Sequence, residues 1–202
     1  MYKQEIENVG RSSAMRGNTV LVIDDVVERP AIEVRDDAGF KGVYAKQAIK
    51  QDSVIFHLKG NISARPSKYT IQLGSNQHLN FPAIRRPNDD VDYCWQYLNH
   101  CCEPNGYMNT TERTFRALRD IAAGEEISFN YLTTESEMAE PFHCRCGSAN
   151  CFGFIQGRNF LTVEQADRLA LALGEDNVVT LFIPAIRKAS GELKILRPAQ
   201  TR

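Results

Sequence analysis

The sequence lacks a long apolar run, a strong excess of charge and a hydrophobic leader. No apolar stretch approaches the ~20 residues that a membrane span requires. The net charge is -1, so no overall basic field favours binding to nucleic acid. Residues 1–7 are charged and contain no apolar core of a secretory signal. We therefore expect an intracellular protein, not secreted by an N-terminal signal, with no membrane partner and no direct nucleic-acid binding.

Internal repeats and low-complexity segments are also absent from the sequence. The chain has 202 residues, of which 43% are hydrophobic and 24% charged, as in ordinary globular proteins. This length is enough to bury a sizeable core, so we expect one domain with extensions.

Six cysteines in a chain without a secretory signal favour thiols or a metal site over a disulfide framework. Cys144, Cys146 and Cys151 follow the spacing C-x-C-x4-C. Three such close thiols cannot all pair with one another, but they can share one metal ion, and a tetrahedral zinc site then needs a fourth ligand. Cys102 is the natural candidate because it lies in a loop interrupted by turn residues at 104–106.

Three segments together resemble the SET-domain lysine methyltransferases. Residues 99–105 read N-H-C-C-E-P-N, residues 124–131 read G-E-E-I-S-F-N-Y, and residues 144–157 read C-R-C-G-S-A-N-C-F-G-F-I-Q-G. They are similar, in order and spacing, to the family's N-H-S-C-x-P-N, G-E-E-[IL]-x-F-D-Y and post-SET zinc motifs. The resemblance covers roughly residues 37–157.

The chain departs from the family pattern at four places. Cys101 replaces a serine and Asn130 replaces an aspartate. In the opening motif G-x-G-[VL]-[FY]-A, Gly42 matches the second glycine, whereas Phe40 stands at the first. Residues 58–60 read L-K-G where many members have Y-x-G, so a tyrosine that lines the lysine channel is missing.

The resemblance implies that Tyr131 is the catalytic residue. A phenol with a pKa of about 10 is a poor base at neutral pH, so we expect it to orient the lysine amine. Phe129 matches a position whose Phe or Tyr identity tunes how many methyl groups are added. Phenylalanine there predicts di- or trimethylation.

The resemblance also assigns residues to the binding of S-adenosylmethionine. They come from the opening turn, the Asn-His loop and the segment before the cysteines: Phe40, Lys41, Gly42, Asn99, His100 and Phe142. Asn99 would bond the amino-acid part of the cofactor. The His100 backbone would face the adenine, with a structural role as the alternative, and Phe142 would cover the adenine ring.

Four thiolate ligands would give zinc a structural role, because no position stays open for water. The expected ligands are Cys102, Cys144, Cys146 and Cys151. Bound zinc would fix the position of the C-terminal loop over the cofactor. Cys94 and Cys101 are left over, and we expect both to be small buried apolar side chains.

The expected fold class is mainly β, a β-rich α+β arrangement. The resemblance implies a SET fold of small sheets with a threaded C-terminal segment. The expected division of the chain is a polar extension at 1–18, a SET domain at 19–139, a post-SET zinc loop at 140–157 and a helical and strand extension at 158–202.

Local patterns predict the individual elements. Strands are expected at 19–23, 31–35, 54–58, 69–73, 114–118, 127–131, 178–183 and 193–196. A helix is expected from Val163 to Gly174, with Thr162 and Gln165 as a capping box. Its apolar face would pack on the SET core, or alternatively on a second subunit, so a monomer and a homodimer both stay open.

The activity implied is S-adenosylmethionine-dependent methylation of a lysine ε-amine in a protein. The zinc loop makes a histone the leading substrate and a non-histone protein the second. The protein would be nuclear in a eukaryote and cytoplasmic in a bacterium. Within the variable insert at 60–92, we expect Arg85 and Arg86 to be solvated rather than bound to a partner.

Two alternatives come from other classes of protein. A SET-like module could bind protein tails without catalysis. A cysteine hydrolase could use His100 with Cys101 or Cys102, although we expect the side chains of such close neighbours to diverge.

Overall fold

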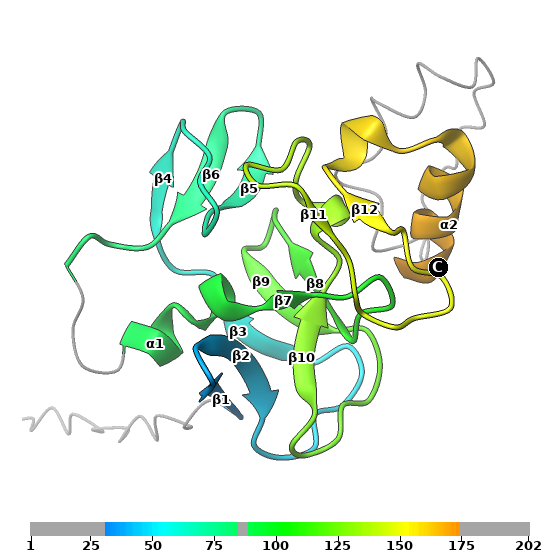
Figure 1. Cartoon of the computed structure of the whole chain (residues 1–202). Helices are drawn as coiled ribbons and strands as arrows, with labels where there is room; N and C mark the ends of the chain where they lie inside the picture. Colours follow the sequence, from blue (N-terminus) through cyan, green and yellow to red (C-terminus); the bar gives the residue numbers. More distant parts are fainter. Residues whose placement is uncertain (1–30, 85–88, 174–202) are drawn as a thin grey trace, which may run out of the picture.

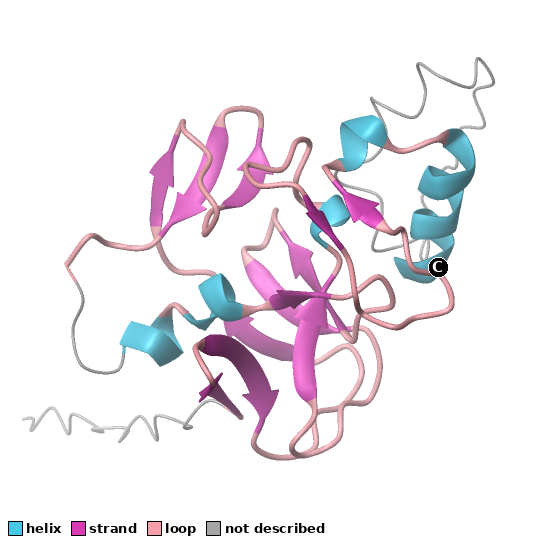
Figure 2. Ribbon diagram, viewed as in Figure 1, coloured by secondary structure: helices cyan, strands magenta, loops and turns pink. Residues whose placement is uncertain are grey.

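The computed structural model describes residues 31–84 and 89–173, which form a mainly β fold of several small sheets (Figure 1, Figure 2). The expected fold class is therefore confirmed. The strands expected at 19–23, 178–183 and 193–196, the polar extension at 1–18, Gly174 and the two arginines at 85–86 lie outside the described residues. Among the described helices, none is long and apolar enough to cross a membrane.

The first sheet joins the two motif-bearing segments. Its strand order is β1 (Ile32–Asp37), β2 (Phe40–Ala45), β10 (Glu126–Phe129), β7 (Asn99–His100). β7 and β10 run parallel, with Phe129 opposite His100. This pairing brings the Asn-His loop beside the segment that ends at Tyr131.

The turn between β1 and β2 explains why the opening motif forms a tight hairpin. Ala38 and Gly39 have φ of 51° and 89°, and the Gly39 N–H donates to Asp36 Oδ1 at 2.9 Å. Two successive residues with positive φ match the right-handed twist of the flanking strands. The Phe40 side chain that follows the turn is 82% exposed, so a large residue fits there.

Two further sheets complete the β framework. One has the order β3 (Val54–His57), β9 (Thr114–Ala117), β8 (Gly106–Asn109), and the other has the order β4 (Asn61–Ser63), β6 (Gln77–Asn80), β5 (Ile71–Gly74). The short helical pieces are α1 (Asp89–Asp92) and the 3-10 turns η1 (Cys94–Tyr97), η2 (Tyr131–Thr133) and η3 (Arg158–Phe160).

The main core lies between these sheets. Trp95 is 1% exposed, and its indole N–H donates to the Lys59 carbonyl at 2.9 Å. Phe115 is fully buried and stacks on Phe56 with ring centroids 5.0 Å apart. An added Cβ at Gly106 would lie 2.4 Å from the Phe115 ring, so only glycine fits there.

The C-terminal part packs on the cysteine-rich loop. The strands β11 (Phe142–His143) and β12 (Phe154–Ile155) pair, and α2 (Val163–Leu173) follows them. The predicted capping box is present: the Gln165 N–H donates to Thr162 Oγ1 at 3.2 Å, and the Thr162 N–H donates to Gln165 Oε1 at 3.0 Å.

The middle of the apolar face of α2, at Ala166 and Leu169, is buried within this chain. Leu169 is fully buried in a second cluster with Phe152 and Ile155 of the loop and with Cys102 and Leu132. Figure 1 shows α2 lying beside β12. The helix thus covers the cysteine loop and the end of the motif segment.

The strand expected at 127–131 ends at Phe129, and the extension to Tyr131 was wrong. Asn130 is fully buried, and its Oδ1 accepts from the Leu132 N–H at 3.1 Å. This side-chain cap satisfies a backbone donor that a continuing strand would leave unpaired, so the chain turns into η2.

Candidate active site and thiol cluster

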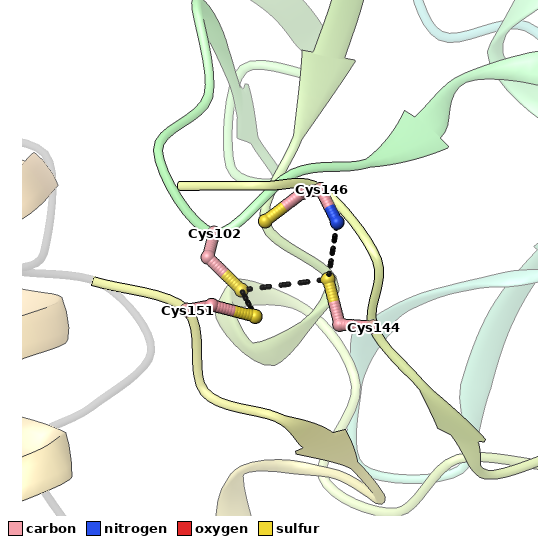
Figure 3. A group of neighbouring side chains, drawn as sticks. All are labelled: Cys102, Cys144, Cys146 and Cys151. Carbon is pink, nitrogen blue, oxygen red and sulfur yellow. Dashed lines mark hydrogen bonds between the residues drawn. The ribbon is translucent and has the colours of Figure 1, made fainter. Parts of the chain in front are cut away.

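The four predicted metal ligands come together in space (Figure 3). The sulfur atoms of Cys102, Cys144, Cys146 and Cys151 all lie within 4.8 Å of one another. Cys102 Sγ is 3.7 Å from Cys144 Sγ and 3.8 Å from Cys151 Sγ. Tetrahedral ligands at about 2.3 Å from zinc are about 3.8 Å apart, whereas a disulfide needs about 2 Å. The thiols therefore fit one shared metal ion.

Backbone N–H groups point at three of the four sulfur atoms. The three donor–acceptor pairs are Cys146 N to Cys144 Sγ at 3.4 Å, Phe152 N to Cys102 Sγ at 3.3 Å and Gly153 N to Cys151 Sγ at 3.4 Å. Hydrogen bonds to the charged form of a group favour that form. The donor set suits a metal that binds soft sulfur ligands.

A short hairpin holds three of the ligands. Cys144, Cys146 and Cys151 all lie in the connection between β11 and β12, and the Cys144 N–H donates to the Gly153 carbonyl at 2.7 Å. Asn150 Nδ2 donates to Glu103 Oε1 at 2.5 Å, which ties the tip of the connection to the loop that carries Cys102.

A cavity of about 910 Å³ adjoins the cluster. Its lining contains both predicted catalytic residues and every predicted cofactor residue except Gly42: Phe40, Lys41, Asn99, His100, Phe129, Tyr131 and Phe142. Cys144 and Cys146 also line it. Segments that lie far apart in the sequence thus share one cavity with two of the thiols.

Hydrogen bonds fix both the hydroxyl and the main-chain N–H of Tyr131. Its hydroxyl donates to the Leu98 carbonyl at 2.7 Å, and its N–H donates to His100 Nδ1 at 3.1 Å. Burial raises the pKa of the Tyr131 phenol, so the phenol stays neutral at physiological pH. The Phe129 ring lies 4.8 Å from the Tyr131 ring and is 3% exposed.

His100 lies at the junction of the cavity and the thiol cluster. Its ring meets those of Tyr131 and Phe142 edge-on, at centroid distances of 5.2 Å and 5.6 Å. Burial lowers the pKa of His100 to about 4, so the imidazole is neutral at pH 7. Its Nε2 lies 3.2 Å from Cys102 Sγ.

The expectation that neighbouring cysteine and histidine side chains diverge was wrong for His100 and Cys102. Their Nε2 and Sγ atoms lie 3.2 Å apart, and Cys102 lies in the bend that follows β7. Cys102 is nevertheless 1% exposed and is not among the residues that line the cavity. A hydrolytic nucleophile must reach its substrate, so this pair does not form a hydrolase site.

The two remaining cysteines differ from each other. Cys94 is 1% exposed, as expected for a small buried side chain, and burial raises its pKa to about 12. Cys101 is only half-buried, contrary to expectation, and its thiol contacts the Glu103 carbonyl at 3.3 Å. Burial raises the pKa of Cys101 and the neighbouring Cys146 raises it further, so the Cys101 thiol borders the four-cysteine cluster.

Asn99 and Gly42 pack together beside the cavity. The Asn99 amide nitrogen donates to Glu126 Oε1 at 2.7 Å and to the Lys41 carbonyl at 3.3 Å. An added Cβ at Gly42 would lie 3.0 Å from Glu126 Oε1. A larger residue at 42 would therefore displace the partner that orients Asn99.

Phe40 and Lys41 lie at the edge of the cavity. Phe40 is 82% exposed. Lys41 Nζ lies 2.8 Å from Asp90 Oδ2 and 4.7 Å from the centroid of the Tyr97 ring. The hydrogen bond with Asp90 raises the pKa of Lys41, so its amine is cationic near the cavity.

The triplet at 58–60 supplies no channel tyrosine. Leu58 is 5% exposed within the main core and is not among the cavity residues. The Lys59 amine lies 3.0 Å from Asp92 at the surface. None of residues 58–60 is therefore among the residues that line the cavity.

A buried polar network was missed from the sequence. Glu135 lines the cavity, and its Oε1 accepts from the Gln72 N–H at 2.9 Å. Gln72 Oε1 accepts in turn from Ser136 N and Oγ, each at 2.7 Å. Burial raises the pKa of Glu135. No sequence motif contains these residues. The one feature that could have indicated the network is the charge of Glu135, four residues after Tyr131.

One family model and several known proteins match part of this chain. The family model described as SET domain matches residues 41–132. Methyltransferase flvH of Aspergillus flavus is 41% identical over 63 residues, which cover 30% of this chain and 35% of the relative. A histone-lysine N-methyltransferase, H3 lysine-36 specific, of Aspergillus oryzae is 40% identical over 83 residues, which cover 38% of this chain and 8% of the relative.

The matched part therefore spans about a third of the first relative and under a tenth of the second. Among solved structures, the crystal structure of KRYPTONITE in complex with mCHG DNA and SAH aligns with a TM-score of 0.47 and 18% identity. That alignment covers 61% of this chain and 28% of the other.

Proposed function

Because this chain carries a SET domain at residues 41–132, we propose that it transfers a methyl group from S-adenosylmethionine to the ε-amine of a protein lysine. The observation that carries the proposal is the single cavity lined by Tyr131, Phe129, Asn99, His100 and Phe142. Relatives named as methyltransferases support the reaction class.

The reaction needs a neutral amine. An exposed lysine has a pKa of about 10.4, so deprotonation at pH 7 costs about 4.6 kcal/mol. S-adenosylmethionine supplies an electrophilic methyl group on a cationic sulfonium. Apolar Phe129, Ile71 and Leu98 line the cavity, and they would shield a bound amine from water, which favours its neutral form.

Tyr131 would orient this amine rather than deprotonate it. Its raised pKa keeps the phenol protonated, and its one O–H is committed to the Leu98 carbonyl. The phenol oxygen keeps lone pairs that can accept from an amine N–H. A fixed acceptor of this kind directs the nitrogen lone pair towards the methyl group.

The six predicted residues would bind S-adenosylmethionine. They are Phe40, Lys41, Gly42, Asn99, His100 and Phe142. The aromatic rings of Phe40 and Phe142 offer faces for the adenine ring. Asn99 would use its amide oxygen, because its nitrogen is held by Glu126.

Zinc would occupy the four-thiol cluster with a structural role. The sulfur spacing and the N–H···S contacts fit a tetrahedral ion with no open position. Because Cys144 and Cys146 line the cavity, the ion would hold one wall of the site in place. We retain the expected boundaries, with a SET domain at 19–139, a zinc loop at 140–157 and an extension at 158–202.

A histone is our leading substrate, and a non-histone protein is the second. The relative from Aspergillus oryzae is named for lysine 36 of histone H3, which makes that lysine the first to test. A histone substrate would place the enzyme in the nucleus. The absence of a channel tyrosine at Leu58 favours one alternative, a module that binds protein tails without catalysis.

The deciding experiment measures methyl transfer from labelled S-adenosylmethionine to core histones and to a mixed protein extract, with products read by mass spectrometry. Wild type is compared with Tyr131→Phe, Cys146→Ser and the control Tyr107→Phe, which lies on β8 away from the cavity. We expect lysine methylation by wild type and the control and a sharp loss in the other two. A folded, zinc-loaded protein that binds histone peptides but transfers nothing would establish the binding module instead.

A further inference from the structure

His100 connects the thiol cluster to the Tyr131 backbone. On one side, its Nε2 lies 3.2 Å from Cys102 Sγ. On the other side, its Nδ1 accepts the Tyr131 N–H at 3.1 Å. One imidazole therefore touches a predicted metal ligand and the predicted catalytic residue.

The hydrogen bonds fix which nitrogen carries the proton. A backbone N–H can only donate, so His100 Nδ1 must be unprotonated to accept from Tyr131. The proton of the neutral ring then lies on Nε2, which is directed at Cys102 Sγ. The ring thus donates an N–H···S hydrogen bond to a cysteine whose sulfur also accepts from the Phe152 N–H at 3.3 Å.

We propose that His100 is a positioning residue that makes the orientation of Tyr131 depend on metal occupancy of the four-thiol cluster. The proposal rests on the zinc site of the proposed function, but it does not require methyl transfer. With the metal bound, the Cys102 thiolate is fixed and charged, and it holds the Nε2–H. The opposite edge of the same rigid ring then holds the Tyr131 backbone.

The surroundings leave the ring little freedom. Its edge-on contacts with Tyr131 and Phe142 restrict rotation. A second hydrogen bond connects Cys102 to the residue before Tyr131: Asn130 Nδ2 donates to the Cys102 carbonyl at 3.4 Å. The Tyr131 hydroxyl is anchored to the carbonyl of Leu98, two residues before His100, so the segment that leads into β7 holds the phenol.

The direct test replaces zinc with the spin-half isotope of cadmium in protein containing isotope-labelled histidine and tyrosine. We expect a scalar correlation between cadmium and the His100 Nε2–H proton, because the hydrogen bond passes through the ligand sulfur. We also expect histidine spectra that show the Nε2–H tautomer for His100. An Nδ1–H tautomer, or no cadmium correlation on a rigid ring, would overturn the proposal without any variant.

The second test uses His100→Phe, which keeps an aromatic ring but removes both hydrogen bonds. Loss of a partner that orients a metal ligand typically lowers metal affinity by about 10- to 100-fold, and we expect that loss in a chelator competition assay. The control is His143→Phe, also beside a ligand cysteine, whose ring instead packs on Phe154 at 4.8 Å.

The chemical shift of the Tyr131 backbone amide distinguishes the proposed coupling from a merely structural role of His100. Zinc removal should shift it in wild type and in His143→Phe, and should shift it much less in His100→Phe, where only the Asn130 bond to Cys102 remains. Zinc affinity within twofold of wild type in His100→Phe, or a zinc-dependent Tyr131 shift that keeps its wild-type size after the substitution, would refute the coupling. Neither readout uses enzymatic turnover, so failure here is distinct from failure of the methyltransferase assignment.

Discussion

The hydroxyl of Tyr131 donates to the main-chain carbonyl oxygen of Leu98 at 2.7 Å. Leu98 directly precedes β7, whose residues also carry the Asn-His motif. The phenol position is therefore set by backbone rather than by a flexible side chain. This arrangement suits a group that must hold a substrate atom in a defined direction.

Tyr131→Phe should abolish most turnover and weaken the fold slightly. The lost hydroxyl removes the acceptor proposed for the lysine amine, so we expect kcat to fall by about 10²-fold or more, while S-adenosylhomocysteine affinity stays unchanged. The hydrogen bond to Leu98 is also lost, at about 1 kcal/mol of stability. Single-turnover kinetics and urea unfolding check both effects, and equal turnover in Tyr131→Phe and Tyr107→Phe would refute the role.

Phe129→Tyr should shift the product towards monomethyl-lysine. Phe129 lines the cavity 4.8 Å from the Tyr131 ring, so an added hydroxyl and any water bound to it would occupy the space around the amine. Mass spectrometry of a methylated histone peptide measures the product distribution. Phe154→Tyr is the control, because Phe154 is 45% exposed and lies outside the cavity lining. Unchanged proportions of di- and trimethyl-lysine would contradict the assignment.

Asn130→Asp should destabilise this chain, although it restores the residue that the family pattern has. The Asn130 side chain accepts from Leu132 N–H and donates to the Cys102 carbonyl. Aspartate keeps the first bond but turns the second into a repulsive contact between two oxygens in a fully buried position. We expect a loss of about 1–3 kcal/mol in the free energy of unfolding.

Urea denaturation in zinc-buffered solution measures this loss. The matched control is Asn109→Asp, because the Asn109 bond to the Glu112 N–H uses only the side-chain oxygen that aspartate retains. A stability within about 0.5 kcal/mol of wild type for Asn130→Asp would show that the amide donor contributes little.

Glu125 should contribute to the stability of the folded state, and this contribution should be lost in acid. The hydrogen bond from Arg119 lowers the pKa of the Glu125 carboxyl from 4.5 to about 2. A lowered carboxyl pKa stabilises the folded state fully above the unfolded value of 4.5, and the effect is lost as pH falls through about 2. The melting-temperature difference between wild type and Glu125→Gln should therefore be constant above pH 4.5 and shrink below it.

Thermal melts across this range, with both proteins in identical buffers, test the sign. Glu112→Gln, which removes a surface pair with Arg116 at 3.5 Å, corrects for acid effects common to all variants. A difference that grows as the pH falls would contradict the assigned direction.

Metal removal should loosen the C-terminal part before the main sheets. The four thiols hold the β11–β12 connection, and Leu169 of α2 packs on that connection. We expect a chelator to raise amide exchange across residues 142–173 while residues 40–45 stay protected, as measured by hydrogen-exchange mass spectrometry.

Two leucines on α2 provide a matched comparison for that measurement. Leu169→Ala should reproduce part of the loosening, because Leu169 is fully buried and its loss costs about 2–5 kcal/mol. Leu171→Ala should not, since Leu171 is 79% exposed on the same helix. Uniform exchange along the whole chain after chelation would mean that the loop and the sheets unfold together.

The clustering of the four cysteines was predictable from sequence. Spacing restricted Cys144, Cys146 and Cys151 to a shared site, the turn residues after Cys102 made it the fourth candidate, and the family motif supplied Tyr131. The helix at Val163–Leu173 was predictable because its capping signal is local. Each of these inferences used residues that are close in sequence or belong to a known pattern.

The parts that were not predicted depend on side chains that meet only in the folded state. Gln72 and Glu135 are 63 residues apart, and the alternation that predicts a strand at 69–73 gives Gln72 no partner. The early end of β10 depends on the Asn130 side chain capping Leu132, which apolar alternation does not reveal. His100 and Cys102 were expected to diverge because strand alternation was applied to immediate neighbours instead of to residues two apart.

The distance along the chain between the thiols has a consequence for the unfolded state. Cys102 is 42 residues from Cys144 and 49 from Cys151, so a bound ion acts as a cross-link that closes a long loop. By the entropy estimate for a covalent cross-link, closing a loop of this size restricts the unfolded chain by about 4 kcal/mol. Unlike a disulfide, this cross-link is in equilibrium with its surroundings, so stability should rise with the logarithm of free zinc concentration once the site is loaded.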